Sequence, residues 1–134
     1  MIFLDTSFLV SYIVEKDTNH EKAVSLMKEI VDGKHGSAIT SEYVFDETVT
    51  VVLVRSKSLD SAVKTGDLIK ESIPVLDVGN SVFEASWKRF RNQGKTMFSF
   101  TDCTILEMIE SNHLDKIATF DREFEGVDNF KVVK

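Results

Sequence analysis

Two acidic residues far apart in the chain stand where a metal-binding or catalytic carboxylate would be expected. Asp5 directly follows the apolar run Ile2–Leu4, and Asp121 directly follows the β-rich run 116–120. Ligands of an open parallel sheet bind beyond the carboxyl ends of the strands, so these two acids would project from one edge. Taken singly, each could equally be a helix cap or a turn residue.

A third acid lies near the start of an apolar helical pattern. Asp102 shares a helix face with Phe98, Ile105 and Ile109, which turns its carboxylate toward the packed side. Buried Asp residues are rare unless they are paired or bind a metal. The alternative is that Thr101 or Asp102 is simply the N-cap of this helix.

The fourth acid is one of two neighbours in a Val-rich helical segment. Glu47 lies three residues after Val44, and Asp46 is the more natural solvent-facing acid. Spacing alone does not decide between Glu47 and Asp46.

If four carboxylates converge, they need cations. Two unit charges about 4 Å apart repel by roughly 4 kcal/mol at an effective dielectric of about 20. Oxygen ligands without a nearby His or Cys favour Mg²⁺ or Mn²⁺ over zinc. Such an ion would orient a water molecule, lower its pKa and stabilise the departing oxygen of a phosphodiester. The acids therefore predict metal-assisted hydrolysis.

Size and composition predict one soluble domain. The chain has 134 residues, 43% hydrophobic and 28% charged, which suits a single globular domain spanning residues 1–134. The single cysteine, Cys103, cannot form an intramolecular disulfide, and a small buried thiol is the simplest reading of it. There is neither a basic leader nor a run of about 18 apolar residues, so we expect a cytoplasmic protein with no membrane association.

The charge balance limits how a polyanion could be held. The net charge is −6, which argues against binding nucleic acid by bulk electrostatics. Metal ions and one local basic segment could supply positive charge instead. That segment provides Arg89, Arg91 and Lys95 as candidate phosphate contacts, with Arg122 beside Asp121 as another. The alternatives are a solvated helix end for the segment and a surface ion pair for Arg122.

Short β-rich runs alternate with helical patterns, which predicts an α/β fold with a mostly parallel sheet of four to five strands flanked by helices. The expected strands are 2–4, 37–40, 75–78, 116–120 and a terminal edge strand at 130–133. The expected helices are 7–14, 19–31, 41–57, 58–71, a helix capped by Asn80 and ending at Gly94, and 99–112.

Four segments in order resemble the PIN-domain nucleases, including VapC-like toxins of toxin–antitoxin pairs. They are Phe3–Ser7, Thr40–Thr48, Phe98–Cys103 and Ala118–Phe124, and together they span almost the whole chain. The resemblance implies a PIN-like three-layer sandwich and endoribonuclease activity. It also implies a homodimer, a protein antitoxin as partner, and RNA as substrate.

The same resemblance assigns the site. By it, Asp5, Glu47, Asp102 and Asp121 are the catalytic, metal-binding quartet, and Thr6 and Ser99 give hydroxyl support. Three alternatives stay open: an RNA-processing nuclease without a toxin role, a catalytically inactive PIN-fold module that binds a partner, and a phosphotransfer domain of receiver or haloacid type. The haloacid type is disfavoured because Asp5 is followed by Thr6 and Ser7 rather than by a second acid two positions on.

Overall fold

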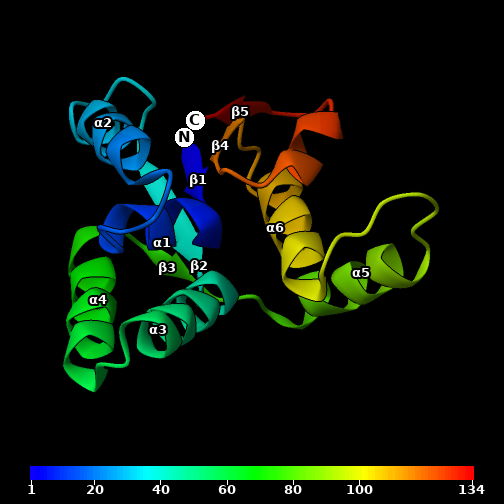
Figure 1. The fold of residues 1–134 in the computed structure, drawn as a ribbon. Coiled ribbons are helices and arrows are strands. Elements are labelled where there is room, and N and C mark those ends of the chain that lie inside the picture. The colour runs from blue at the N-terminus through cyan, green and yellow to red at the C-terminus, as the bar shows by residue number, and fades with distance from the viewer.

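A computed structural model describes residues 1–134 and contains one five-stranded, all-parallel sheet with the strand order β3-β2-β1-β4-β5 (Figure 1). The strands are β1 (Ile2–Leu4), β2 (Ala38–Ser41), β3 (Val75–Leu76), β4 (Lys116–Ala118) and β5 (Lys131–Val133). The central strand β1 pairs Phe3 with Ile39 on one side and with Ile117 on the other. The predicted α/β class is therefore confirmed.

Six α-helices surround the sheet: α1 (Thr6–Ile13), α2 (His20–Val31), α3 (Glu42–Ser56), α4 (Leu59–Ser72), α5 (Asn80–Arg91) and α6 (Phe100–Ser111). A short 3₁₀ helix, η1 (Arg122–Gly126), follows β4. Helices α1, α2 and α4 lie on one side of the sheet and α6 lies on the other (Figure 1). Helix α5 packs against α6. The helices and strands thus form the three layers expected.

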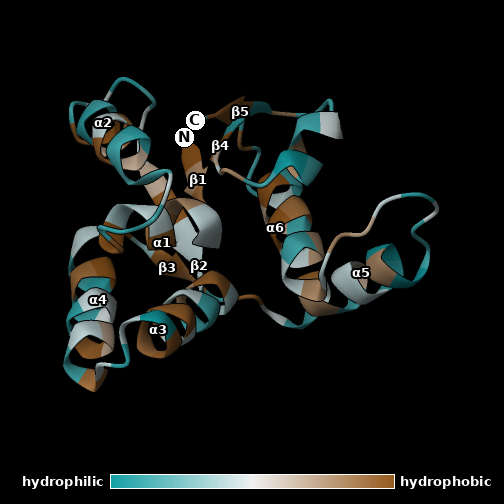
Figure 2. Ribbon diagram, viewed as in Figure 1, coloured by the Kyte–Doolittle hydropathy of each residue, from teal (hydrophilic) through white to brown (hydrophobic).

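The core gathers around β1, whose three residues are almost completely buried. A strand covered by helices on both faces must be apolar throughout, which explains the continuous run Ile2–Leu4. Figure 2 shows β1 and β3 as hydrophobic, whereas α2 and α5 alternate hydrophobic and hydrophilic residues. Cys103 is fully buried in this core, as predicted for a structural thiol. None of the helices combines the length and hydrophobicity that crossing a bilayer requires.

Two strands end earlier than predicted because side chains capture the following backbone. The third strand stops at Leu76 rather than Val78, since the Val78 N–H donates to Glu42 Oε1 at 2.8 Å. The fourth stops at Ala118 rather than Phe120, since the Phe120 N–H donates to Ser7 Oγ at 2.9 Å.

The predicted cap and end of the fifth helix were wrong. Gly79, not Asn80, is the residue before α5, and no side chain caps its first turn. The helix ends at Arg91, three residues before Gly94. An Asn at the first helical position has its own backbone already in the helix, so it cannot act as N-cap.

Candidate metal centre

Asp5 is the buried and most tightly held acid of the site. It is the N-cap of α1, and its Oδ1 accepts the Thr6 N–H at 2.7 Å. Its Oδ2 accepts the Ser7 hydroxyl at 2.8 Å and the Thr119 hydroxyl at 2.7 Å. Its own N–H donates to the Ala118 carbonyl at 3.1 Å, which ties β1 to β4. The carboxylate is therefore fixed from two distant segments of the chain.

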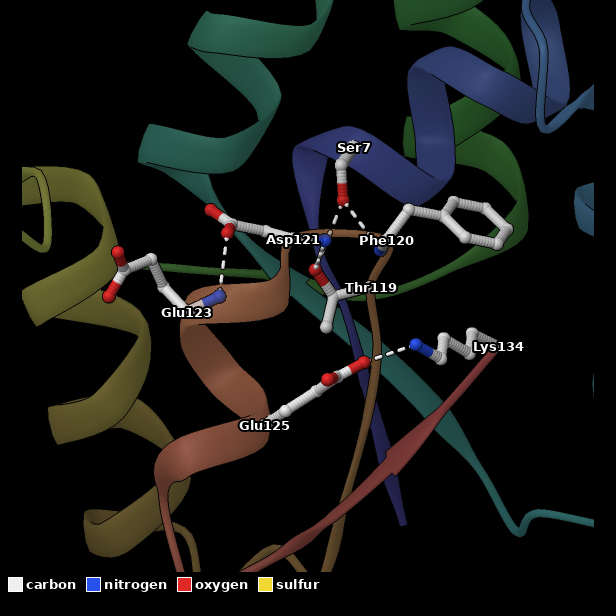
Figure 3. A network of polar contacts seen from close by, with 7 residues as sticks. All are labelled: Ser7, Thr119, Phe120, Asp121, Glu123, Glu125 and Lys134. Atoms are coloured by element: carbon white, nitrogen blue, oxygen red, sulfur yellow. Dashed lines mark hydrogen bonds and ion pairs between the residues drawn. The ribbon is translucent and has the colours of Figure 1, made fainter.

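The hydroxyls around Asp5 extend the network to Asp121 (Figure 3). Ser7 Oγ and Thr119 Oγ1 are 3.0 Å apart, and Thr119 Oγ1 accepts the Asp121 N–H at 3.0 Å. Asp121 caps η1, with its Oδ1 accepting the Glu123 N–H at 2.9 Å. Asp5 and Asp121 thus come after neighbouring parallel strands, and the Thr119 hydroxyl links the Asp5 carboxylate to the Asp121 backbone N–H.

Asp102 reaches the site from the start of α6. The N-cap of this helix is Ser99, which corrects the alternative that Thr101 or Asp102 caps it. Ser99 Oγ accepts the Asp102 N–H at 3.0 Å, and Asp102 Oδ2 accepts the Ser99 N–H at 2.9 Å. This reciprocal capping box fixes the Asp102 side chain at the helix end.

Glu47 projects from the middle of α3 and has an exposed side chain. It lines a pocket of about 380 Å³ together with Tyr43, Asp46 and Thr101. Partial loss of hydration raises the pKa of the Glu47 carboxyl group, and the negative charges of Asp5 and Asp102 raise it further. Both Asp46 and Glu47 are exposed, and the effect of Asp5 and Asp102 on the Glu47 pKa favours Glu47 as the fourth acid.

The carboxylates act on one another. Burial raises the pKa of Asp5, against the hydrogen bonds from Thr119, Ser7 and Thr6, which lower it. Burial also raises the pKa of Asp102, and the charges of Asp5 and Asp121 add to this effect. Asp5 and Asp102 thus raise the pKa of Glu47, and Asp5 and Asp121 raise that of Asp102, so the four acids lie close enough to disfavour one another's ionisation. No three of them lie close enough together in the structure to hold one metal ion.

The donor set nevertheless suits a hard divalent cation. All the converging groups are carboxylates and hydroxyls, and Mg²⁺ binds through a few carboxylates with waters filling the remaining positions. Two buried hydroxyls, Thr6 Oγ1 and Thr48 Oγ1, have no hydrogen-bond partner. Each directly follows an acid of the quartet, Asp5 and Glu47 respectively. Of the two, Thr6 Oγ1 is close enough to Glu47 to lower its pKa, so an unsatisfied hydroxyl and repelling carboxylates occur together there, which a cation with its waters would relieve.

Comparison with known proteins decides the family. The sequence model of the PIN domain matches residues 2–129. The chain belongs to the PIN domain family. It is 28% identical over 127 residues to a VapC ribonuclease of Archaeoglobus fulgidus, which covers 90% of this chain and 77% of that protein.

Solved structures of toxins share the fold of this PIN domain. The VapC20 toxin of Mycobacterium tuberculosis, described as cleaving the sarcin–ricin loop, superposes with a TM-score of 0.85 at 24% identity and covers 96% of this chain and 98% of its own. A toxin–antitoxin complex of Klebsiella pneumoniae superposes with a TM-score of 0.66 at 16% identity and covers all of this chain and 97% of its own.

Two residues of this PIN domain that sequence reasoning did not single out are Ser7 and Thr119. Each hydroxyl donates to Asp5 Oδ2. Both lie inside segments that carry the family resemblance, beside the acids, and a Ser or Thr within two positions of a post-strand Asp was the available signal. Of the two residues predicted to give hydroxyl support, Ser99 contacts Asp102, whereas Thr6 donates its backbone N–H to Asp5 and its side chain lowers the pKa of Glu47.

The basic residues of this PIN domain differ in their surroundings. Arg89 forms ion pairs with Glu107 at 2.6 Å and Glu110 at 2.8 Å, which link α5 to α6. Arg91 and Lys95 are exposed and form no ion pair. Arg122 is exposed and lines a polar pocket of about 500 Å³ beside the site.

Proposed function

We propose that this PIN domain is a Mg²⁺- or Mn²⁺-dependent endoribonuclease and the toxin of a toxin–antitoxin pair. The observation that supports the proposal most directly is that Asp5, Glu47, Asp102 and Asp121 disfavour one another's ionisation, with Asp5 held in place by the Ser7 and Thr119 hydroxyls. Similarity to a VapC ribonuclease and to toxin structures supports the substrate class and the biological role.

These four acids would hold the cation. When bound, it supplies positive charge to the scissile phosphate and acidifies a water molecule. Asp5 would be the least mobile ligand, because Ser7, Thr119 and the Thr6 N–H fix both of its oxygens. Asp102 is oriented by its capping box with Ser99. Glu47, whose side chain is exposed, would face the bound substrate.

We further propose the partners that the family relation supports: an RNA substrate, a second copy in a homodimer and a protein antitoxin. We also propose that the protein is cytoplasmic. Phosphate contacts from Arg91, Lys95 and Arg122 would add local positive charge that the acidic chain otherwise lacks. Arg89 can contribute only by releasing Glu107 and Glu110.

Purified protein incubated with total RNA tests the proposal. We expect cleavage with Mg²⁺ or Mn²⁺, loss of cleavage with EDTA, and recovery when the metal is added back. Asp102→Asn should abolish cleavage while the protein stays folded, and Asp67→Asn, which alters an exposed acid on α4, should cleave as the wild type does. Wild-type cleavage by Asp102→Asn would reject the metal centre.

Two further comparisons sharpen the assignment. Glu47→Gln should abolish cleavage, whereas Asp46→Asn should retain it, and the reverse result would move the fourth ligand by one position. Growth arrest on expression in cells, absent with Asp102→Asn and relieved by a product encoded next to this gene, would separate a toxin from an RNA-processing enzyme. No cleavage of any RNA by folded, metal-loaded protein would favour the non-catalytic binding module.

A further inference from the structure

Helix α5 carries an exposed aromatic surface, formed by Phe83, Trp87 and Phe90 together with Phe100 at the start of α6. The three α5 residues are 41%, 49% and 36% exposed. They recur at helical spacing, so their rings lie on one face of the helix. Large apolar side chains gathered on a protein surface mark an interaction site.

The rings of this aromatic surface hold one another in place. Phe100 lies at its centre, with its ring centroid 5.3 Å from Phe83, 6.5 Å from Trp87 and 6.3 Å from Phe90. Trp87 and Phe90 are stacked, with centroids 5.7 Å apart and an interplanar angle of 18°. Rings fixed in this way present flat faces to a partner with little further loss of side-chain entropy.

The aromatic surface continues into the metal centre. Tyr43 lies 6.3 Å from Phe100, centroid to centroid, and lines the same pocket as Glu47 and Thr101. Phe100 precedes Asp102 by two residues on α6, the helix against which α5 packs (Figure 1). A strand with its phosphate at the carboxylates would therefore meet these rings within its next nucleotides.

The cations next to these rings fit a polyanion. Lys88 and Arg91 share a surface pocket of about 650 Å³ with Trp87 and a single acid, Glu84, so cations outnumber acids there. Neither forms an ion pair, in contrast to Arg89, which is engaged with Glu107. In a chain of net charge −6, unpaired cations beside exposed rings match the alternation of phosphates and bases along a strand.

We propose that the aromatic surface stacks unpaired bases of the RNA next to the scissile phosphate, while Lys88 and Arg91 contact the neighbouring phosphates. The proposal rests on the ribonuclease function proposed above. It specifies the substrate as a single-stranded segment or loop, because bases within a duplex are already stacked on each other. Stacking of this kind tolerates many sequences, since every base has a flat face.

Trp87 is the only tryptophan of the chain, so its fluorescence reports directly on this surface. Protein in EDTA, where cleavage is blocked, is titrated with a short single-stranded RNA, with an abasic strand of equal length, and with a duplex. We expect saturable quenching by the single strand and much weaker quenching by the abasic strand and the duplex. Equal quenching by the intact and abasic strands, or none by either, would overturn the proposal.

Variants that keep the Trp87 probe test the neighbouring rings. Phe83→Ala or Phe90→Ala should weaken binding of the single strand by roughly five- to one-hundred-fold, the usual loss when one stacking ring is removed. Leu59→Ala, which truncates an exposed apolar side chain on α4, is the matched control and should bind as the wild type does. In cleavage assays the Phe variants should raise KM more than they lower kcat.

Measurements without RNA test whether the aromatic surface instead binds a second copy of the chain. If Trp87 emission changes with protein concentration alone, and if Phe90→Ala dissociates an oligomer seen by light scattering, the surface is a protein interface and the proposal is wrong. Because binding is measured in EDTA, quenching without any cleavage on adding Mg²⁺ would sink the proposed hydrolysis and leave the stacking intact. Cleavage without base-dependent quenching would support the proposed hydrolysis and reject the stacking.

Discussion

The two ends of the central sheet differ sharply in chemistry. At the amino end, a pocket of about 810 Å³ is lined mainly by apolar residues of α1, α2 and α4, among them Leu9, Met27 and Ile69, with no Asp, Glu, Lys, Arg, His or Cys. At the carboxyl end, a pocket of about 380 Å³ is lined by Glu47, Asp46 and hydroxyl residues. The larger cavity is therefore not the one next to the proposed metal ligands.

This difference assigns separate tasks to the two ends. Burial of apolar side chains at the amino end stabilises the fold, because it removes apolar area from water. Burial of carboxylates at the carboxyl end opposes folding, because the charged form loses hydration and faces like charges. Changes at the carboxyl end should therefore affect cleavage, and changes at the amino end should affect stability.

The largest effect is expected for Asp5→Asn. It removes a buried charge and keeps the side-chain volume, so the metal-free protein should remain folded. Cleavage should fall by at least the ~10²–10³-fold that loss of one preorganised electrostatic group costs. Initial rates of RNA cleavage with Mg²⁺ measure it, with circular dichroism as the check on folding. Near-normal rates in a folded variant would remove Asp5 from the site.

The matching change at the amino end is Ile69→Ala. Ile69 is 4% exposed and lines the apolar pocket, so the truncation should lower the free energy of unfolding by ~2–4 kcal/mol. Denaturant titration measures the loss, and kcat per folded molecule should not change. Ile69→Val provides a milder version with a loss of ~0.5–1.5 kcal/mol. A fall in kcat at denaturant concentrations too low to unfold the variant would show that the two ends of the sheet are coupled.

Thr119→Val should give a smaller loss of activity. It keeps the side-chain shape but removes the hydroxyl that donates to Asp5 Oδ2 and accepts the Asp121 N–H. Groups that orient metal ligands usually contribute ~10–100-fold to metal affinity or activity, so the concentration of Mg²⁺ needed for half-maximal cleavage should rise. Thr119→Ser restores the hydroxyl and should recover most of the activity. A shift in thermal stability without any change in the Mg²⁺ requirement would indicate a purely structural role.

The smallest effect concerns pH. The folded-state pKa values of Asp5, Glu47 and Asp102 are raised above those of ordinary Asp and Glu side chains, so just above the ordinary values these three groups bind more protons in the folded protein than in the unfolded chain. The contribution of these three acids to the stability of the metal-free protein should therefore fall as pH rises through their folded-state pKa values.

Glu47→Gln isolates the contribution of the Glu47 carboxylate to the pH dependence of stability. Because it removes a repelled carboxylate, it should raise the melting temperature of metal-free protein at pH 7 by a few degrees, and the difference should vanish at acidic pH. Mg²⁺ should stabilise the wild type more than the variant. Melting curves by calorimetry measure both effects. A variant less stable than the wild type at pH 7 would contradict the repulsion inferred for this site.

The sequence predicted the elements well where periodicity and position carried the information. The five strands and six helices follow the predicted order, and Asp5 and Asp121 emerge at one edge because parallel strands end on the same side. It failed where distant side chains set the boundaries. Glu42 ends β3 by capturing the backbone of Val78, and no local pattern around residue 78 reports that contact.

The hydrogen bonds that hold the acids in place also could not be predicted from sequence spacing. Thr119 donates to Asp5 across 114 positions of sequence, a contact that follows from the pairing of β1 with β4 and not from any spacing. The sequence pattern also does not decide whether Asp102 is the N-cap of its helix. The structure shows that Ser99 is the N-cap and that Asp102 completes the capping box, while the charges of Asp5 and Asp121 raise the Asp102 pKa.

The central place of β1 has a consequence for synthesis on the ribosome. The first strand to emerge can pair with β2 on one side, but its other neighbour, β4, is among the last segments to be translated. Until β4 arrives, Asp5 lacks the Thr119 hydroxyl and Asp121 lacks its place beside it. A chain that ends before Thr119 lacks both the hydroxyl that holds Asp5 and the proposed ligand Asp121, so such unfinished copies should lack the proposed nuclease activity.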